Sequence, residues 1–142
     1  MIDHVLVAID GSEGARRAAD FARELATQVG AKLTVLLVLE PIPMVSVGFG
    51  DLYGLARRQP TDEELDLLRT ALDRAADGFP GEVEKVIEYG PAAETICQVA
   101  DQREVGLIVV GARGLGTVGR FLIGSVSDRV VHLAKRNVAV VH

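Results

Sequence analysis

Apolar residues in this chain gather into segments of two alternating kinds. One kind is a short, nearly continuous aliphatic run, which is typical of a parallel strand buried on both faces. The other kind carries apolar residues at spacings of three and four, the period of one helical face. The pattern predicts strands at residues 4–9, 32–39, 82–88, 106–110 and 137–141, with a helix in each of the four intervals between them.

Capping residues indicate where these helices begin and end. Ser12 is placed to cap the first helix, and Gly30 to terminate it. Thr61 and Glu64 have the spacing of a capping box at the start of the second helix. Pro91 is expected in the first turn of the third helix, where its fixed φ suits the helix.

The regular alternation of strands and helices indicates one α/β domain, residues 1–142, with an open five-stranded parallel sheet and four helices on both faces. Charged residues interrupt the strand at 82–88, which is typical of a sheet edge. If the first and fourth strands are neighbours where the strand order reverses, the order is 3-2-1-4-5. Ligands of such sheets bind at the carboxyl ends of the strands, where Asp10 and Gly111 would then emerge side by side.

Residues 41–60 show no sustained period and contain three prolines and three glycines. A connection of about 20 residues is long for a compact domain. Two interpretations stay open: a lid or interaction segment, and an insertion that the fold simply tolerates.

The stretch after the fourth strand is rich in glycine. Five glycines lie between positions 111 and 124, and Gly124-Ser125 opens a helical pattern. Glycines let backbone N–H groups converge, and a helix N-terminus adds unpaired donors and partial positive charge. This combination predicts an anion site, with Ser125 as the helix N-cap or as a direct phosphate ligand.

Two familiar phosphate motifs fit this stretch poorly. Gly119 and Gly124 have the spacing of a Walker A motif, but Ser125 stands where that motif requires Lys. Gly114, Gly116 and Gly119 match the dinucleotide fingerprint by letter. That fingerprint, however, belongs to the first strand-helix turn and needs an acidic residue about 20 positions later, whereas this run follows the fourth strand.

Composition narrows the function further. The net charge of −5 argues against binding to nucleic acid or to a membrane surface. Residues 111–142 nevertheless carry five basic side chains and one acidic one, so positive charge accompanies the glycine-rich stretch, and Arg113 and Arg120 are candidates for phosphate contact. The lone Cys97, the lack of an apolar run of about 18 residues and the lack of a signal peptide lead us to expect a soluble, cytoplasmic protein.

A third motif frame resembles the nucleotide-binding signature of the universal stress protein family: Gly111-x2-Gly114-x9-Gly124-Ser125. Two further stretches are similar to that family, namely its first strand and turn and the strand end where its adenine contact lies: Val7-Ala8-Ile9-Asp10-Gly11-Ser12 and Leu36-Leu37-Val38. The resemblance covers essentially the whole chain. Members with the full glycine pattern are typically ATP binders, so the resemblance implies a Rossmann-like, adenine nucleotide alpha hydrolase-like fold that binds ATP or another adenine nucleotide, with Mg²⁺.

The resemblance also implies the residues of the site. Val38 would offer backbone groups to adenine, and Ser127 a hydroxyl to the phosphates. Asp10 would accept from a ribose hydroxyl or help to hold Mg²⁺, although a carboxylate after a strand is also a common turn and cap residue. The expected ligand-binding residues are Ala8, Ile9, Asp10, Val38, Gly111, Arg113, Gly114, Gly124, Ser125, Val126 and Ser127.

Three functions follow from this reading. The first is a nucleotide-dependent regulatory or stress-response module that signals through a dimer or through residues 41–60. The second is a slow ATPase or nucleotide hydrolase, which has less support because neither a Walker lysine nor a well-placed general base is present: the histidines are His4, His132 and His142. The third is an interaction protein without nucleotide. The resemblance further implies a homodimer through the apolar last strand, which a monomer would have to hide.

Overall fold

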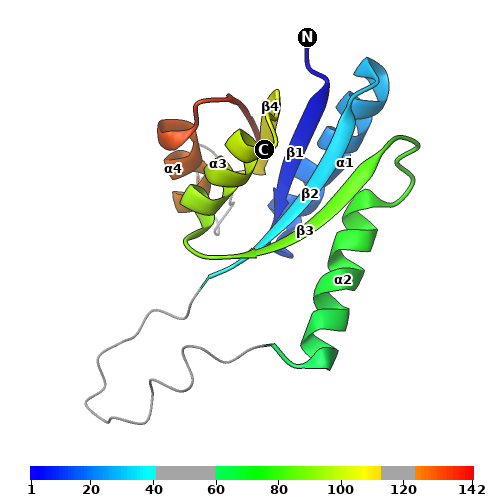
Figure 1. The fold of residues 1–142 in the computed structure, drawn as a ribbon, viewed down its shortest axis with the longest axis vertical. Helices are drawn as coiled ribbons and strands as arrows, with labels where there is room; N and C mark the ends of the chain where they lie inside the picture. Colours follow the sequence, from blue (N-terminus) through cyan, green and yellow to red (C-terminus); the bar gives the residue numbers. More distant parts are fainter. Residues whose placement is uncertain (41–59, 113–123) are drawn as a thin grey trace.

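The computed structural model describes residues 1–40, 60–112 and 124–142. Within these ranges five strands alternate with four helices (Figure 1). The expectations for residues 41–59 and 113–123 lie outside the described residues. The elements are β1 (His4–Ile9), α1 (Glu13–Val29), β2 (Lys32–Leu39), α2 (Asp62–Ala76), β3 (Val83–Tyr89), α3 (Ala92–Gln102), β4 (Leu107–Gly111), α4 (Ser125–Leu133) and β5 (Asn137–Val141).

The strands form one parallel sheet in the order β3-β2-β1-β4-β5. This order confirms the predicted 3-2-1-4-5 arrangement and places β3 at one edge. The strand order reverses between β1 and β4, where Val7 pairs with Val109, while on its other side Val7 pairs with Val35. The carboxyl ends of β1, β2 and β4 therefore meet at one edge of the sheet.

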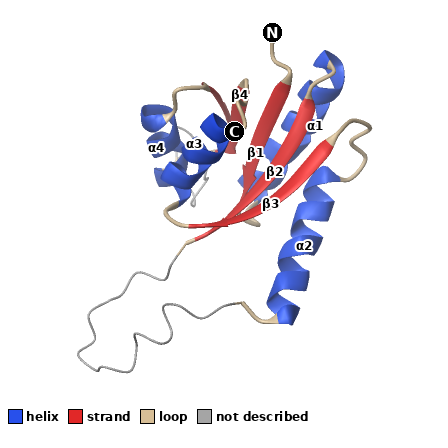
Figure 2. Cartoon of the chain, in the orientation of Figure 1, coloured by secondary structure: helices blue, strands red, loops and turns tan. Residues whose placement is uncertain are grey.

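Helices cover both faces of the sheet, α1 and α2 on one and α3 and α4 on the other (Figure 2). Side chains alternate along each strand, so Val5 and Val7 enter the core under α1, whereas Leu6 enters the core under α3. The inner side of α1 consists of buried small residues, which lets the helix lie close to the sheet: Gly14, Ala15, Ala18, Ala19, Ala22 and Ala26.

The predicted caps of the first two helices are confirmed. Ser12 Oγ accepts from the Ala15 N–H at 3.2 Å, and Gly30 ends α1 with a left-handed φ of 70°. In α2, Glu64 N–H donates to Thr61 Oγ1 at 3.2 Å and Thr61 N–H donates to the Glu64 carboxylate at 2.8 Å, which completes the capping box.

At two helix starts the cap residue differs from the prediction by one position. Pro91 has a ψ of 128° and is the N-cap of α3, so it precedes the first turn instead of forming part of it. Ser125 is the first helical residue of α4, and Gly124 is the N-cap with φ −60° and ψ 157°. The helical pattern that begins at Ser125 is therefore correct, but the expectation that Ser125 could be the N-cap is wrong.

A contact between two glycines fixes α1 against the end of β4. A Cβ on Gly111 would lie 2.5 Å from the carbonyl carbon of Gly14, and a Cβ on Gly14 would lie 2.7 Å from the carbonyl oxygen of Ala112. Such distances are too short for real Cβ contacts, so both positions require glycine. The close approach brings the turn that contains Asp10 and Ser12 to the same edge of the sheet as Gly111.

No helix within the described ranges is both long enough and apolar enough to cross a lipid bilayer.

Candidate functional site

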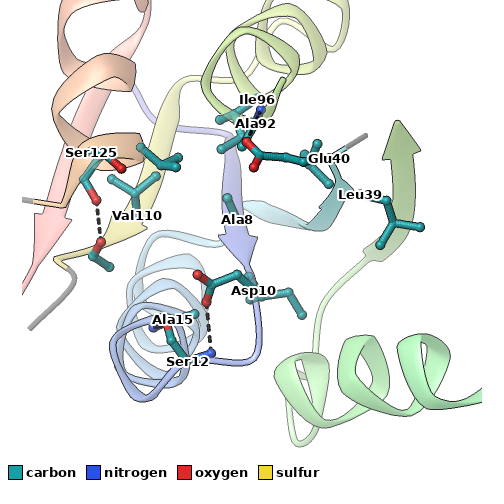
Figure 3. A pocket seen from close by; sticks show the side chains of 15 residues that line it. Ala8, Asp10, Ser12, Ala15, Leu39, Glu40, Ala92, Ile96, Val110 and Ser125 are labelled. Atoms are coloured by element: carbon teal, nitrogen blue, oxygen red, sulfur yellow. Dashed lines mark hydrogen bonds between the residues drawn. The ribbon is translucent and has the colours of Figure 1, made fainter. Parts of the chain in front are cut away.

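A cavity of about 390 Å³ lies at the carboxyl ends of β1, β2 and β4, between the starts of α3 and α4 (Figure 3). Its volume is within the usual range for sites that bind small molecules and cofactors. The position is the one that strand-order reversal predicts. The described residues that line it are Ala8, Ile9, Asp10, Ser12, Ala15, Val38, Leu39, Glu40, Ala92, Ile96, Val110, Gly111, Ser125, Val126 and Ser127.

Most of the predicted ligand-binding residues meet in this cavity: Ala8, Ile9, Asp10, Val38, Gly111, Ser125, Val126 and Ser127 line it. Gly124 does not line it but immediately precedes Ser125 as the N-cap of α4. Arg113 and Gly114, together with Arg120, lie outside the described residues.

Other lining residues were not predicted. Ala92 and Ile96 come from α3, and Leu39 and Glu40 extend the wall beyond Val38. A signal for Glu40 was available, because it is the first polar residue after a buried strand whose end was expected at the site. The contribution of α3 depends on how the helix packs over the sheet, which its own sequence does not specify.

Asp10 is held in a turn at the end of β1. Its Oδ1 accepts from the Ser12 N–H at 2.9 Å, the pattern of an Asx turn. The expected turn-forming role of Asp10 is therefore present in the structure, and the same bond orients the carboxylate beside the cavity (Figure 3).

The start of α4 forms a second polar wall. Ser125, Val126 and Ser127 are its first three residues, so the partial positive charge of the helix start lies at the cavity. The Ser127 side chain is 4% exposed, and its hydroxyl donates to the Gly111 carbonyl oxygen at 2.5 Å. This bond ties α4 to the end of β4. A direct donation from Ser127 to a phosphate would require the bond to break.

The start of α3 is capped from another part of the chain. Pro91 provides no side-chain cap, and the Ala92 N–H donates instead to Glu40 Oε1 at 3.0 Å. In the first turn of α3, Glu94 accepts from Arg129 of α4 at 2.5 Å, and this hydrogen bond lowers the pKa of the Glu94 carboxyl. The first turn of α3 and the middle of α4 are therefore linked.

Between its polar ends, the cavity is apolar. Ala8 and Val110 contribute from the sheet, Val38 from the end of β2, and Ile96 from α3. Ile96 and Val110 are each 3% exposed, so the core keeps their positions fixed. The arrangement combines an apolar centre suited to a flat ring with a helix start suited to an anion.

The titratable side chains among the described lining residues are Asp10 and Glu40, and each accepts a backbone N–H. His4 and His132 lie elsewhere. His4 bonds to Thr34 at the opposite end of β1, and His132 Nδ1 lies 2.7 Å from the Asp128 carbonyl oxygen of its own helix. In the described ranges no three His, Cys, Asp or Glu side chains gather as a metal site.

A doubly wound parallel sheet with a cavity at its switch point defines the Rossmann-like class of α/β fold. The sequence model of the universal stress protein family matches residues 1–142, and the chain belongs to that family.

Individual relatives agree with this assignment. A Thermus aquaticus protein named universal stress protein in QAH/OAS sulfhydrylase 3'region is 37% identical over 134 residues, which cover 92% of each chain. The structure of universal stress protein UspA from Lactobacillus plantarum has a TM-score of 0.76 at 29% identity, covering 99% of this chain and 98% of that one. The crystal structure of a universal stress protein in complex with cAMP has a TM-score of 0.71 at 30% identity, and the match covers 99% of this chain and 97% of that one.

Proposed function

We propose that this chain binds an adenine nucleotide in the cavity and acts as a nucleotide-dependent regulatory or stress-response module. The observation that carries the proposal is the cavity itself, which combines apolar lining residues with the Asp10 carboxylate and the start of α4. The relative solved in complex with cAMP, at 30% identity over nearly the whole chain, supports an adenine nucleotide as the ligand. ATP is the nucleotide that the complete glycine pattern favours.

We propose a place for each part of the nucleotide on the basis of the lining residues. The phosphates would lie at the start of α4, near Ser125 and Val126, where helical N–H groups and the helix dipole favour an anion. Arg113 and Gly114 of the glycine pattern would complete this end. The adenine ring would lie against Val38 and the other apolar side chains, with Asp10 accepting from a ribose hydroxyl.

Mg²⁺ fits this site only together with the phosphates. Mg²⁺ is commonly held by one or two carboxylates with substrate phosphates and waters, and Asp10 supplies one carboxylate beside the expected phosphate end. A bound Mg²⁺ would neutralise phosphate charge close to the Asp10 carboxylate. We propose that the metal enters with the nucleotide and is not held by the protein alone.

We propose binding, not turnover, as the function of the site. General acid–base catalysis needs a group that can exchange a proton with the ligand. The described lining residues include no His or Lys, and their titratable side chains are the carboxylates of Asp10 and Glu40, each of which accepts one backbone N–H. The cavity is thus better suited to holding a nucleotide than to cleaving it.

We also propose a homodimer formed along β5. This strand is at the edge of the sheet, paired with β4 on one side. Its residues Val138, Ala139 and Val140 are only partly buried. A second copy of the strand would cover this apolar edge.

Mass spectrometry of small molecules released from denatured, freshly purified protein tests the proposed ligand. We expect an adenine nucleotide in a stoichiometric amount. Protein that carries none, and that fails to retain added ATP through gel filtration at saturating concentration, would argue for an interaction protein without nucleotide.

Timed incubation with ATP and Mg²⁺ tests whether the site binds ATP without hydrolysing it. We expect turnover near the uncatalysed background. Rapid release of product would instead make the chain a nucleotide hydrolase.

A further inference from the structure

Glu40 brings a second carboxylate to the cavity, at a different end from Asp10. Figure 3 shows Glu40 beside Ala92 and Ile96 at the start of α3, whereas Asp10 lies beside Ser12 at the start of α1. The proposed nucleotide site assigns a ligand contact to Asp10 but none to Glu40. Glu40 follows β2 directly and is two positions beyond Val38, the expected adenine contact, on the same side of the strand.

The two helix starts that face the cavity differ in how they are capped. At α3 the Glu40 carboxylate accepts the Ala92 N–H at 3.0 Å, across 52 positions of sequence, and so provides the cap that Pro91 lacks. At α4 the N-cap is Gly124, which has no side chain. Because an anion already occupies the start of α3, a nucleotide phosphate is repelled there and directed toward α4.

The α3 end therefore receives the base, and the chemistry of Glu40 restricts which base fits. An ionised carboxylate only accepts hydrogen bonds, and one oxygen of Glu40 already takes the Ala92 N–H. A purine with an amino group at C6 can donate to the carboxylate. A purine with an oxo group at C6 would place its O6 acceptor against the carboxylate, and it could donate only through the neighbouring N1–H after the ring shifts away from this position.

We propose that Glu40 is a specificity-determining residue that selects a 6-amino purine over a 6-oxo purine at the α3 end of the cavity. The inference rests on the proposed function, since it presumes that a purine nucleotide binds there. It adds a residue that turns general purine binding into recognition of adenine.

Calorimetric titration with ATP and with inosine triphosphate tests this role, because the two nucleotides differ only at the six-membered ring edge. We expect the wild-type protein to prefer ATP by roughly tenfold or more, the effect of one hydrogen bond to a charged group. Glu40→Gln should reduce that preference by about tenfold, because its amide can donate to a 6-oxo group while its oxygen still caps Ala92.

Glu64→Gln is the matched control. Glu64 also caps a helix start, that of α2, through a bond of 2.8 Å to the Thr61 N–H, but it does not line the cavity. The same chemical change at Glu64 should leave the ratio of the two affinities as in wild type. Circular dichroism of both variants reports whether the fold is retained.

The possible failures are distinguishable. If wild-type protein binds neither nucleotide, the proposed function and this inference fall together. If it binds ATP and inosine triphosphate equally, or if Glu40→Gln keeps the wild-type ratio, the inference alone is overturned. A Glu40→Gln variant that instead changes the ratio of ATP to 2'-deoxy-ATP would place the carboxylate at the sugar and also overturn it.

Discussion

At the scale of single residues, the tightest constraint near the cavity is the contact between Gly111 and the first turn of α1. We predict that Gly111→Ala destabilises the fold by about 1–3 kcal/mol, because a Cβ would lie 2.5 Å from Gly14 backbone atoms and 2.9 Å from the Ala15 nitrogen. Urea unfolding measures the change in the free energy of unfolding.

Gly106→Ala is the control for this prediction. Gly106 immediately precedes β4, and a Cβ there would be 3.5 Å from the His4 carbonyl oxygen, an ordinary van der Waals contact. A much smaller loss of stability is therefore expected. Equal losses in the two variants would contradict the steric explanation for Gly111.

His4 gives a second prediction at this scale, on pH. His4 is 3% exposed, and burial, followed by the charge of Lys32, lowers its pKa below 6.5, whereas the hydrogen bond with the Arg103 carbonyl and the charges of Glu84 and Asp3 act in the opposite direction. The unfolded chain therefore binds a proton more readily than the folded chain, so stability rises with pH in this range and is lost as pH falls below about 6.5.

The free energy of unfolding, measured between pH 7.5 and 5, should fall more steeply in wild type than in His4→Gln. Titration of the Glu84 carboxyl does not contribute between pH 7.5 and 5. Its pKa is lowered from 4.5 by the hydrogen bond from Arg103, so its stabilising effect is lost only at lower pH. Identical profiles in the two proteins would show that His4 does not titrate as the structure implies.

At the scale of elements, the capping box of α2 makes a local prediction. Thr61→Ala should reduce stability by about 1 kcal/mol, because it leaves the Glu64 N–H without its 3.2 Å partner. Thr70→Ala makes the same change in the middle of the same helix, where the hydroxyl donates only to the Asp66 carbonyl four residues earlier. Alanine suits that position, so Thr70→Ala should be neutral or slightly stabilising. Thermal unfolding of both variants checks the difference.

The elements themselves could be predicted because their signals are local. Aliphatic runs, helical spacing and the caps at Ser12, Gly30 and Thr61 lie within a few residues of what they specify. The cap residues of α3 and α4 were each misplaced by one position, although the helical pattern from Ser125 was predicted correctly. Pro91 fits both the N-cap and the first turn, and Gly124 is a cap without a side chain to reveal it.

Long-range contacts at the site could not be predicted in the same way. The hydrogen bond between Glu40 and Ala92 joins positions 52 residues apart, and the hydrogen bond between Ser127 and Gly111 joins positions 16 residues apart. Neither partner in these bonds carries a local pattern that identifies the other. The sequence indicated which strand ends would meet, but not that α3 would form a wall of the cavity or that Ser127 would bond to β4.

At the scale of the whole molecule, the exposed β5 edge predicts association. Light scattering at tens of micromolar should give the mass of a dimer. The Val141 carbonyl accepts from the N–H of Ala112, which directly follows β4, so the neighbouring Val140 directs its N–H away from β4, where a second copy could accept it. Val140→Pro removes that donor and should shift the protein toward monomer. A wild-type monomer at this concentration would refute the dimer.

The central claim, that an adenine nucleotide binds with its phosphates at the start of α4, is tested most directly by calorimetric titration of ATP with Mg²⁺. We predict saturable binding to wild type. The affinity should be lower by roughly tenfold or more in Ser125→Asp than in Ser125→Asn, because Asp and Asn have the same shape but only the Asp carboxylate repels the phosphates at the helix start. No saturable binding to wild type, or equal affinities in the two variants, would contradict the account.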